Sequence, residues 1–168
     1  GDQRCFDHPF DPYLYSEFTP RVLTTPSYSA YLKIAEGCDH PCSFCVIPQM
    51  RGQFRSRRFE SVLREAEILA ARGVRELTLI GQDTTSYGRD LGLRNGLGAL
   101  LRQLGTVPGL VWLRFRYSYP NQVTDELIAA VAETPGAAKY FDIPVQHANA
   151  GGLKAWRRRG GDKACAGM

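Results

Sequence analysis

Three cysteines stand close together in the segment CDHPCSFC, at positions Cys38, Cys42 and Cys45. The spacing C-x3-C-x2-C brings three thiolates onto one short loop, where they can converge on a single metal centre. A closed structural site generally needs a fourth protein ligand, so three thiolates leave one position open for chemistry. We therefore treat this loop as the feature around which the rest of the chain is organised.

The cysteine count favours a metal over disulfides. The total of 5 is odd, and three of the cysteines lie too near one another for a conventional disulfide framework, which suits metal binding in a reducing compartment. Zinc held by these three with His40 as a fourth ligand is one interpretation, but zinc proteins usually supply two separated pairs of ligands, and no second pair exists here. A 4Fe-4S cluster normally takes four thiolates, so three protein ligands leave one iron free for an outside molecule. Cys5 and Cys165, near the two ends, are interpreted as spare thiols.

The composition is that of an ordinary globular protein and argues against a membrane or disulfide-rich secreted class. The chain has 168 residues, of which 43% are hydrophobic and 23% charged, and one domain is the first expectation. Neither an apolar run of about 18 residues nor a secretory signal is visible, so we expect a cytoplasmic protein. The net charge is +4, with basic clusters at 51–58 and 157–159. A solvated basic face is the first interpretation of each cluster, and binding to RNA or the ribosome is the second.

Apolar residues alternate between strand-like and helix-like patterns. Residues 1–28 contain several prolines and no sustained apolar period, so we expect a lead-in or linker. Ser61 is the expected N-cap of the first helix, which Gly73 ends, and Thr124 is the expected N-cap of the third. Strands are predicted at 30–35, 77–80, 110–119 and 140–145, and helices within 61–72, 97–104, 124–133 and 153–159.

The repeat of these elements predicts the fold class. Strands that begin near residues 31, 76, 110 and 140 give βα units of roughly 30–35 residues, as in a (β/α) barrel of about eight units. We therefore predict an α/β fold, a partial (β/α) barrel of about four βα units over residues 29–161, with an irregular tail at 162–168. The cysteine loop follows the first strand, on the face where barrel enzymes carry their active sites. Four strands do not close a barrel, and the chain starts at Gly1 without an initiator methionine, so we expect a truncated fragment.

The loop resembles the radical S-adenosylmethionine (radical SAM) superfamily, through C-x3-C-x2-C after the first strand and an aromatic residue, Phe44, before the last cysteine. This resemblance implies that Cys38, Cys42 and Cys45 ligate a 4Fe-4S cluster whose free iron binds S-adenosylmethionine. It also implies that an electron from the reduced cluster releases a 5'-deoxyadenosyl radical, which abstracts hydrogen. Phe44 would lie near the adenine. The cofactors then carry the difficult chemistry, while the protein places and shields them.

Within the superfamily, YLKIAEGCDHPCSFCVIPQMRGQFRSR and GQDTTSYG resemble the methylthiotransferases, and the likeness runs over residues 23–161. The segments RFRYSYP and DIPVQHA are more similar to members that act on an aspartate of ribosomal protein S-twelve than to members that act on transfer RNA. The implied reaction replaces a hydrogen on the aspartate β-carbon by a methylthio group, with S-adenosylmethionine as radical source and methyl donor. The implied partners are ribosomal protein S-twelve or the ribosome and an electron-donor protein, with RNA as a further candidate.

By the same resemblance, Gly81, Gln82 and Asp83 occupy the second-strand motif that meets the methionyl end of the cofactor. A carboxylate at a strand end is a suitable acceptor for a cationic amine. The resemblance assigns no catalytic residue. Further candidates for cofactor or substrate contact project from the ends of later strands: Arg114, Arg116, Gln146 and His147, of which Arg116 and Gln146 are the expected cofactor contacts.

Two departures limit what the chain is expected to do. Methylthiotransferases carry a second 4Fe-4S cluster on an N-terminal domain and an RNA-binding-like β domain at the C-terminus, and we expect that cluster only in a full-length parent. Gly151, Gly152, Trp156 and the terminal DKACAGM also depart from the family pattern. We therefore expect one cluster and no complete sulfur insertion by this chain alone. A transfer-RNA methylthiotransferase is the close alternative, and a non-catalytic zinc or RNA-binding module is the alternative from a different class.

Overall fold

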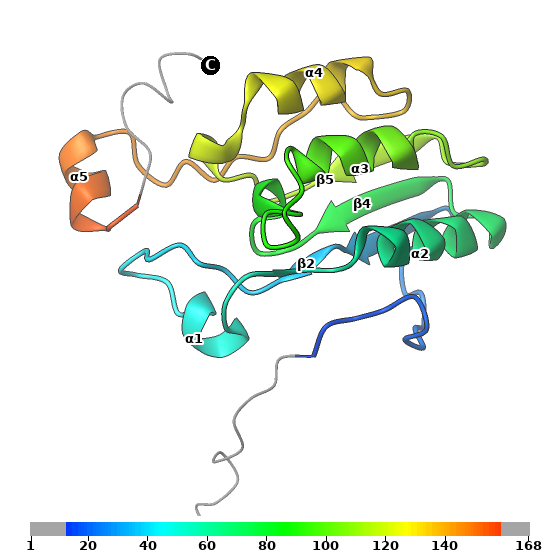
Figure 1. Cartoon of the computed structure of the whole chain (residues 1–168), viewed down its shortest axis with the longest axis horizontal. Coiled ribbons are helices and arrows are strands. Elements are labelled where there is room, and N and C mark those ends of the chain that lie inside the picture. Colours follow the sequence, from blue (N-terminus) through cyan, green and yellow to red (C-terminus); the bar gives the residue numbers. More distant parts are fainter. Residues whose placement is uncertain (1–12, 159–168) are drawn as a thin grey trace, which may run out of the picture.

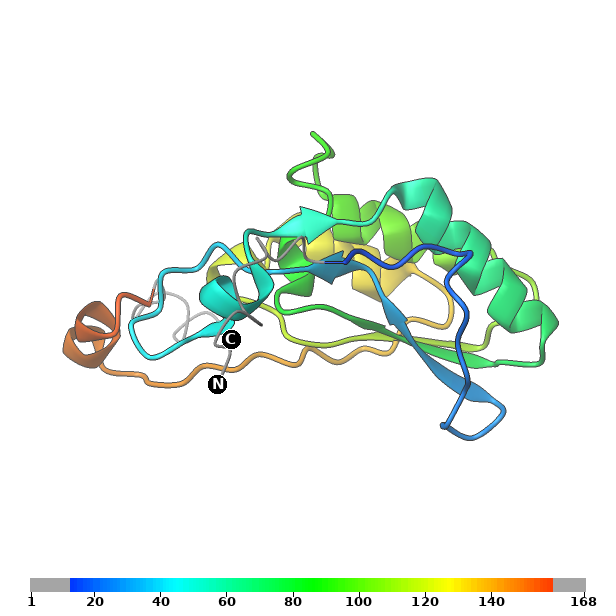
Figure 2. The same ribbon diagram turned by 90° about the horizontal axis from the view of Figure 1, so that it is seen from below.

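The computed structural model describes residues 13–158, and their core is a three-stranded parallel sheet in the order β1-β4-β5 (Figure 1). Leu32 of β1 stands opposite Leu79 of β4, and Leu77 of β4 stands opposite Leu113 of β5. Figure 2 shows helices α2, α3 and α4 on the same side of these strands. The elements are β1 Ser29–Lys33, β2 Ala35–Glu36, α1 Ile47–Arg51, β3 Arg55–Ser56, α2 Phe59–Ala71, β4 Glu76–Ile80, η2 Thr84–Ser86, α3 Gly96–Leu104, β5 Trp112–Phe115, η3 Pro120–Gln122, α4 Asp125–Glu133 and α5 Ala150–Ala155.

The hydrophobic core lies between the sheet and its helices. The leucine stripe predicted for α3 is buried in full, as are the inward-facing residues of the strands. Burying a leucine side chain contributes about 1.5–3 kcal/mol, so the stripe accounts for much of the attachment of α3 to the sheet. The residues concerned are Leu97, Leu100, Leu101 and Leu104 on the helix and Leu32, Leu77, Leu79, Leu113 and Phe115 on the strands.

The predicted α/β fold is confirmed, but the strand predicted at 140–145 is wrong. Residues 139–149 contain no helix or strand, and Leu113 with Ala137 makes an isolated parallel bridge instead. Pro144 has no N–H to donate, and no strand among the described residues lies on the far side of this segment. The segment therefore lacks the backbone hydrogen bonds that would make it a strand of the sheet. The segment still packs against the sheet, because the rings of Phe141 and Phe115 meet edge to face at 5.3 Å. The described residues therefore hold three βα units followed by an extended segment.

Two helix starts differ from the prediction, and one agrees. Helix α2 begins at Phe59, two residues before the predicted cap, and Ser61 lies inside it. The Ser61 hydroxyl instead donates to Oε2 of Glu17 at 2.5 Å. Thr124 caps α4 as predicted, accepting a hydrogen bond from the Leu127 N–H at 3.2 Å. Helix α5 begins at Ala150, where the Asn149 side chain caps it.

The third strand is shorter than predicted. Strand β5 ends at Phe115, and Tyr117 adopts a φ of 65°, which a continuing strand does not tolerate. The predicted alternation within β5 is confirmed, since Leu113 and Phe115 are buried while Trp112 is exposed and Arg114 is partly exposed. Cys5, Cys165 and the predicted tail at 162–168 lie outside the described residues.

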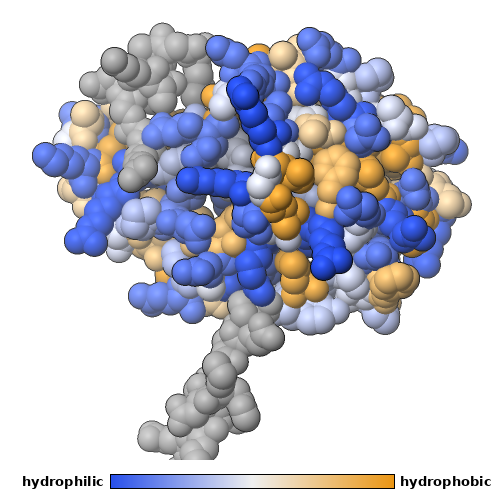
Figure 3. All heavy atoms as spheres, in the orientation of Figure 1, coloured by the Kyte–Doolittle hydropathy of each residue, from blue (hydrophilic) through white to orange (hydrophobic). Residues whose placement is uncertain are grey.

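Hydrophilic residues cover most of the face seen in Figure 3, and hydrophobic residues occur there in small groups. Among residues 13–158, no helix is both long enough and apolar enough to cross a bilayer.

A buried ion network joins the lead-in segment to α2. The Arg57 side chain is 1% exposed, and its Nη1 donates to Oε2 of Glu65 at 2.6 Å and to the Lys33 carbonyl at 2.9 Å. Nη1 of Arg21, in the lead-in, donates to the other carboxylate oxygen of Glu65 at 2.6 Å. One carboxylate therefore pairs with two arginines, one of them fully buried.

Replacing Glu65 by alanine is expected to lower the free energy of unfolding by about 3–5 kcal/mol, because the Arg57 charge stays buried without its carboxylate. Glu67 is exposed on the same helix, and Glu67→Ala serves as the matched control, with a change within about 0.5 kcal/mol. Urea unfolding of the two variants measures the difference. Equal midpoints would show that the network adds no stability.

Candidate metal centre and its surroundings

The cysteine loop leaves the sheet at the carboxyl end of β1 and is closed at its base by a short antiparallel pair. Strand β2 pairs with β3, so Ala35 stands opposite Ser56. Beyond this pair the Cys38 N–H donates to the Gly52 carbonyl at 3.2 Å. Strands of two residues carry no periodic signal, and the sequence did not predict this pairing.

Gly37 fixes the point where the loop turns away. Its φ is 81°, a conformation that L side chains rarely adopt, and its N–H donates to Oε1 of Gln82 at 2.9 Å. This hydrogen bond ties the start of the loop to the end of β4. The segments that follow β1 and β4 thus hold the start of the loop in place.

The three cysteines line one cavity of about 250 Å³. All three are free thiols, with Cys38 and Cys42 buried and Cys45 partly exposed. Burial raises the pKa of the Cys38 thiol, and the nearby Asp83 carboxylate and the other two cysteines raise it further. Within residues 13–158 no three Cys, His, Asp or Glu side chains already stand at ligand geometry, so a metal centre would have to draw the thiols together as thiolates.

Some of the predicted cofactor contacts line this cavity and others do not. Phe44, Gln82, Asp83 and Gln146 border it. Gly81 is buried at the end of β4 but is not part of the lining. The outer candidates point elsewhere: Arg114 pairs with Glu76 at 2.6 Å, Arg116 lies 3.8 Å from Asp142, and His147 accepts from the Asn149 N–H at 2.8 Å.

Ser118 also borders the cavity, and the sequence did not single it out. Its side chain is 0% exposed, and its Oγ has no hydrogen-bond partner among the described residues. Leaving a buried hydroxyl without a hydrogen-bond partner costs about 1–3 kcal/mol. Nothing in a serine near a strand end distinguishes it from its neighbours, so only the folded structure reveals the unpaired group.

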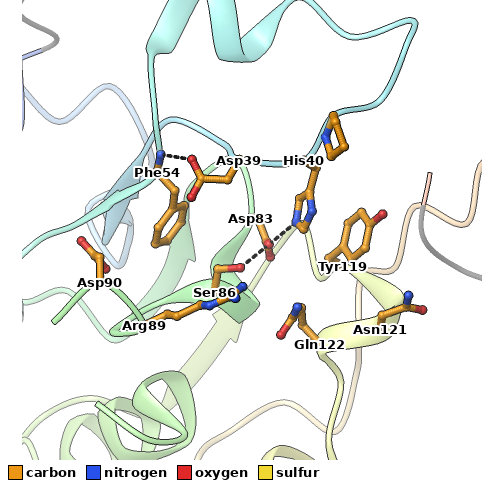
Figure 4. Close-up of a pocket in the computed structure, with 11 residues that line it drawn as sticks. Asp39, His40, Phe54, Asp83, Ser86, Arg89, Asp90, Tyr119, Asn121 and Gln122 are labelled. Atoms are coloured by element: carbon orange, nitrogen blue, oxygen red, sulfur yellow. Dashed lines mark hydrogen bonds and ion pairs between the residues drawn. The ribbon is translucent and has the colours of Figure 1, made fainter. Parts of the chain in front are cut away.

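Asp83 lies in the wall that this cavity shares with a second one, and Figure 4 shows the lining of the second cavity. Nε2 of His40 lies 2.7 Å from Oδ2 of Asp83, and Ser86 Oγ donates to the same oxygen at 2.6 Å. The Thr85 N–H donates to Oδ1 at 3.0 Å, which makes Asp83 the cap of η2. Burial alone would raise the pKa of the Asp83 carboxyl, but hydrogen bonds from His40, Ser86 and Thr85 outweigh burial and lower it. Asp83 is therefore an ionised carboxylate already occupied by its neighbours.

The same wall includes an aromatic stack. The His40 ring lies parallel to the Tyr119 ring, with centroids 3.7 Å apart. His40 is the fourth ligand of the zinc interpretation, yet its Nε2 is engaged with Asp83 and not with a cysteine. The cavity on the far side has a volume of about 740 Å³ and is lined mainly by polar side chains, among them Asp39, Arg89, Asp90, Asn121 and Gln122.

Comparisons with known proteins identify the family of the chain. Residues 32–165 match the Radical SAM superfamily. The chain is 61% identical over 146 residues to the ribosomal protein uS12 methylthiotransferase RimO of Koribacter versatilis, covering 87% of this chain and 29% of that protein. It is 59% identical over 153 residues to the RimO protein of Solibacter usitatus, covering 90% and 33%. The chain thus spans about a third of the length of the curated relatives it matches.

Among solved structures, the fold is similar to the radical S-adenosylmethionine methyltransferase TsrM from Kitasatospora setae, determined with cobalamin and a 4Fe-4S cluster bound. The TM-score is 0.63 at 19% sequence identity, and the alignment covers 80% of this chain and 27% of that one. At this level of identity the likeness concerns the fold alone.

Proposed function

Because the chain belongs to the radical SAM superfamily, we propose that it forms the core of a methylthiotransferase that acts on an aspartate of ribosomal protein uS12 (S-twelve). One observation carries the proposal. Three free cysteines line a single cavity at the carboxyl end of β1, beside a buried hydroxyl that lacks a partner. The names of the relatives, at 61% and 59% identity, supply the substrate.

In this proposal Cys38, Cys42 and Cys45 hold a 4Fe-4S cluster through three thiolates. When bound, the cluster and S-adenosylmethionine supply the radical that abstracts hydrogen from the aspartate β-carbon, and S-adenosylmethionine also supplies the methyl group. The donor set fits this group, because three soft sulfur ligands from one loop leave one iron for an outside molecule.

The chain's own residues bind and orient. Ser118, Gln146 and Phe44 border the cavity in which the cofactors would lie. Gln82 keeps Gly37, and with it the start of the loop, at the end of β4. We propose that Asp83 positions His40 in the cavity wall. Gly81 and Arg116 also remain proposed cofactor contacts, although neither lines the cavity.

The proposal includes partners beyond the cofactors. An electron-donor protein would reduce the cluster, and a second 4Fe-4S cluster would belong to the rest of a full-length enzyme acting in the cytoplasm, with RNA contact a further candidate. The transfer-RNA methylthiotransferase stays the close alternative, since the three-cysteine loop does not by itself distinguish the two substrates. The zinc or RNA-binding module is less well supported, because His40 is turned to Asp83.

A domain exchange tests the substrate. The matching residues of the Koribacter versatilis RimO protein would be replaced by this chain's, and the chimera produced in cells that lack their own enzyme. We expect methylthioaspartate in ribosomal protein uS12 by mass spectrometry, and none from a chimera that carries Cys42→Ala. Methylthioadenosine in transfer RNA, with ribosomal protein uS12 unmodified, would contradict the choice of substrate.

A further inference from the structure

The C-terminal part of the described chain lies against the cysteine loop. Figures 1 and 2 both show α5 beside the outer end of that loop. The Ser43 N–H donates to the Trp156 carbonyl at 2.9 Å, and the Trp156 ring meets the Phe44 ring edge to face at 5.5 Å. Residues just beyond α5 are therefore fixed next to the cysteines.

Arg158 uses this placement to reach a cysteine. Its Nη1 lies 3.8 Å from Sγ of Cys42, within the range of a weak hydrogen bond to sulfur. Its Nη2 donates to the Pro144 carbonyl at 2.5 Å, and the guanidinium carbon lies 4.9 Å from the centre of the Tyr119 ring. These contacts hold the Arg158 guanidinium between Pro144, Tyr119 and Cys42.

The charge of Arg158 is directed at the cavity. The residue is part of the lining of the cysteine cavity and is only partly exposed. Within residues 13–158 no carboxylate forms an ion pair with it, whereas Arg21, Arg57, Arg94, Arg102 and Arg114 all have such partners within 3.2 Å. Its natural counter-charge is a thiolate, or an anionic group bound by thiolates.

We propose that Arg158 is a positioning residue that raises the reduction potential of a cluster held by the three cysteines. This inference rests on the proposed function. A 4Fe-4S cluster with three thiolates is anionic, and reduction adds one more negative charge. A fixed cation at the sulfur of one ligand stabilises the reduced form more than the oxidised form, and more so in a cavity with restricted water.

The test is a redox titration of the whole chain, reconstituted anaerobically with iron and sulfide and kept free of S-adenosylmethionine. At a fixed potential near the midpoint, Arg158→Gln is expected to lower the ratio of reduced to oxidised cluster about tenfold, which is about 59 mV for a one-electron couple. Arg158→Lys keeps the charge and should recover most of the ratio. Arg157→Gln removes an exposed neighbouring charge with no contact to a cysteine and should leave the ratio unchanged.

The inference would be overturned if Arg158→Gln had the same ratio of reduced to oxidised cluster as the unsubstituted chain. It would also be overturned if Arg157→Gln lowered that ratio as much as Arg158→Gln does. If Arg158→Gln retains no cluster, Arg158→Lys decides. A normal cluster in the lysine variant would support the need for charge, and its loss there too would contradict it. The absence of a cluster from the unsubstituted chain would overturn the proposed function as well. A normal cluster in the unsubstituted chain, with the same ratio of reduced to oxidised cluster in Arg158→Gln, would overturn this inference alone.

Discussion

Alanine at any one of Cys38, Cys42 or Cys45 is expected to abolish the iron–sulfur cluster of the anaerobically reconstituted chain. The three thiols line one cavity, and the described residues offer no other cysteine to replace a lost ligand. Two thiolates cannot retain a cluster that already has an open iron, so the iron content should fall from about four per chain to near zero. Iron and sulfide assays with the visible absorbance spectrum measure this.

Cys5 and Cys165 provide the matched controls, because the same substitution there removes a thiol that lies outside the C-x3-C-x2-C motif in the sequence. Cys5→Ala and Cys165→Ala should keep the full iron content and the full reductive cleavage of S-adenosylmethionine. If Cys5→Ala lost as much iron as Cys42→Ala, the metal centre would have been assigned to the wrong cysteines.

Gly37→Ala is expected to have the second largest effect. A Cβ at this position would lie 2.1 Å from the Gln53 carbonyl oxygen and 2.7 Å from the Gly52 carbonyl oxygen, and the positive φ adds about 1–2 kcal/mol of strain. Both obstacles are backbone atoms, so the base of the loop has to open. We expect the reconstituted chain to lose most of its iron and its melting temperature to fall.

Gly73 offers a control with the same backbone problem but free space. Its φ is 96°, and no atom lies within 4 Å of a Cβ added there. Gly73→Ala should therefore cost only the strain of about 1–2 kcal/mol and leave the iron content unchanged. Equal iron contents in the two variants would mean that the close contacts at Gly37 do not hold the loop.

The sequence predicted correctly those helices and caps that depend only on residues close together in the chain. The leucine stripe of α3 and the Thr124 cap of α4 depend on side chains a few residues apart, and both are confirmed. The strand at 140–145 failed because a run of apolar residues does not reveal whether a partner strand is present. The prediction of Ser61 as a helix cap failed for a similar reason. Its hydroxyl donates a hydrogen bond to Glu17, 44 residues away, and the local sequence does not show this contact.

The site divides in the same way. The three cysteines lie within eight residues of each other, and their spacing alone indicated a metal centre. Arg158 and Cys42 are separated by 116 residues, and no sequence pattern joins them. The unpaired hydroxyl of Ser118 is likewise a property of burial, which the sequence does not display.

Anaerobic reconstitution of this chain with iron and sulfide, followed by reduction in the presence of S-adenosylmethionine, tests most directly whether the loop is a radical SAM centre. We predict about four iron and four sulfide per chain, a brown protein, and formation of 5'-deoxyadenosine. A colourless protein that holds zinc, with no cluster absorbance and no cleavage of S-adenosylmethionine, would contradict the assignment.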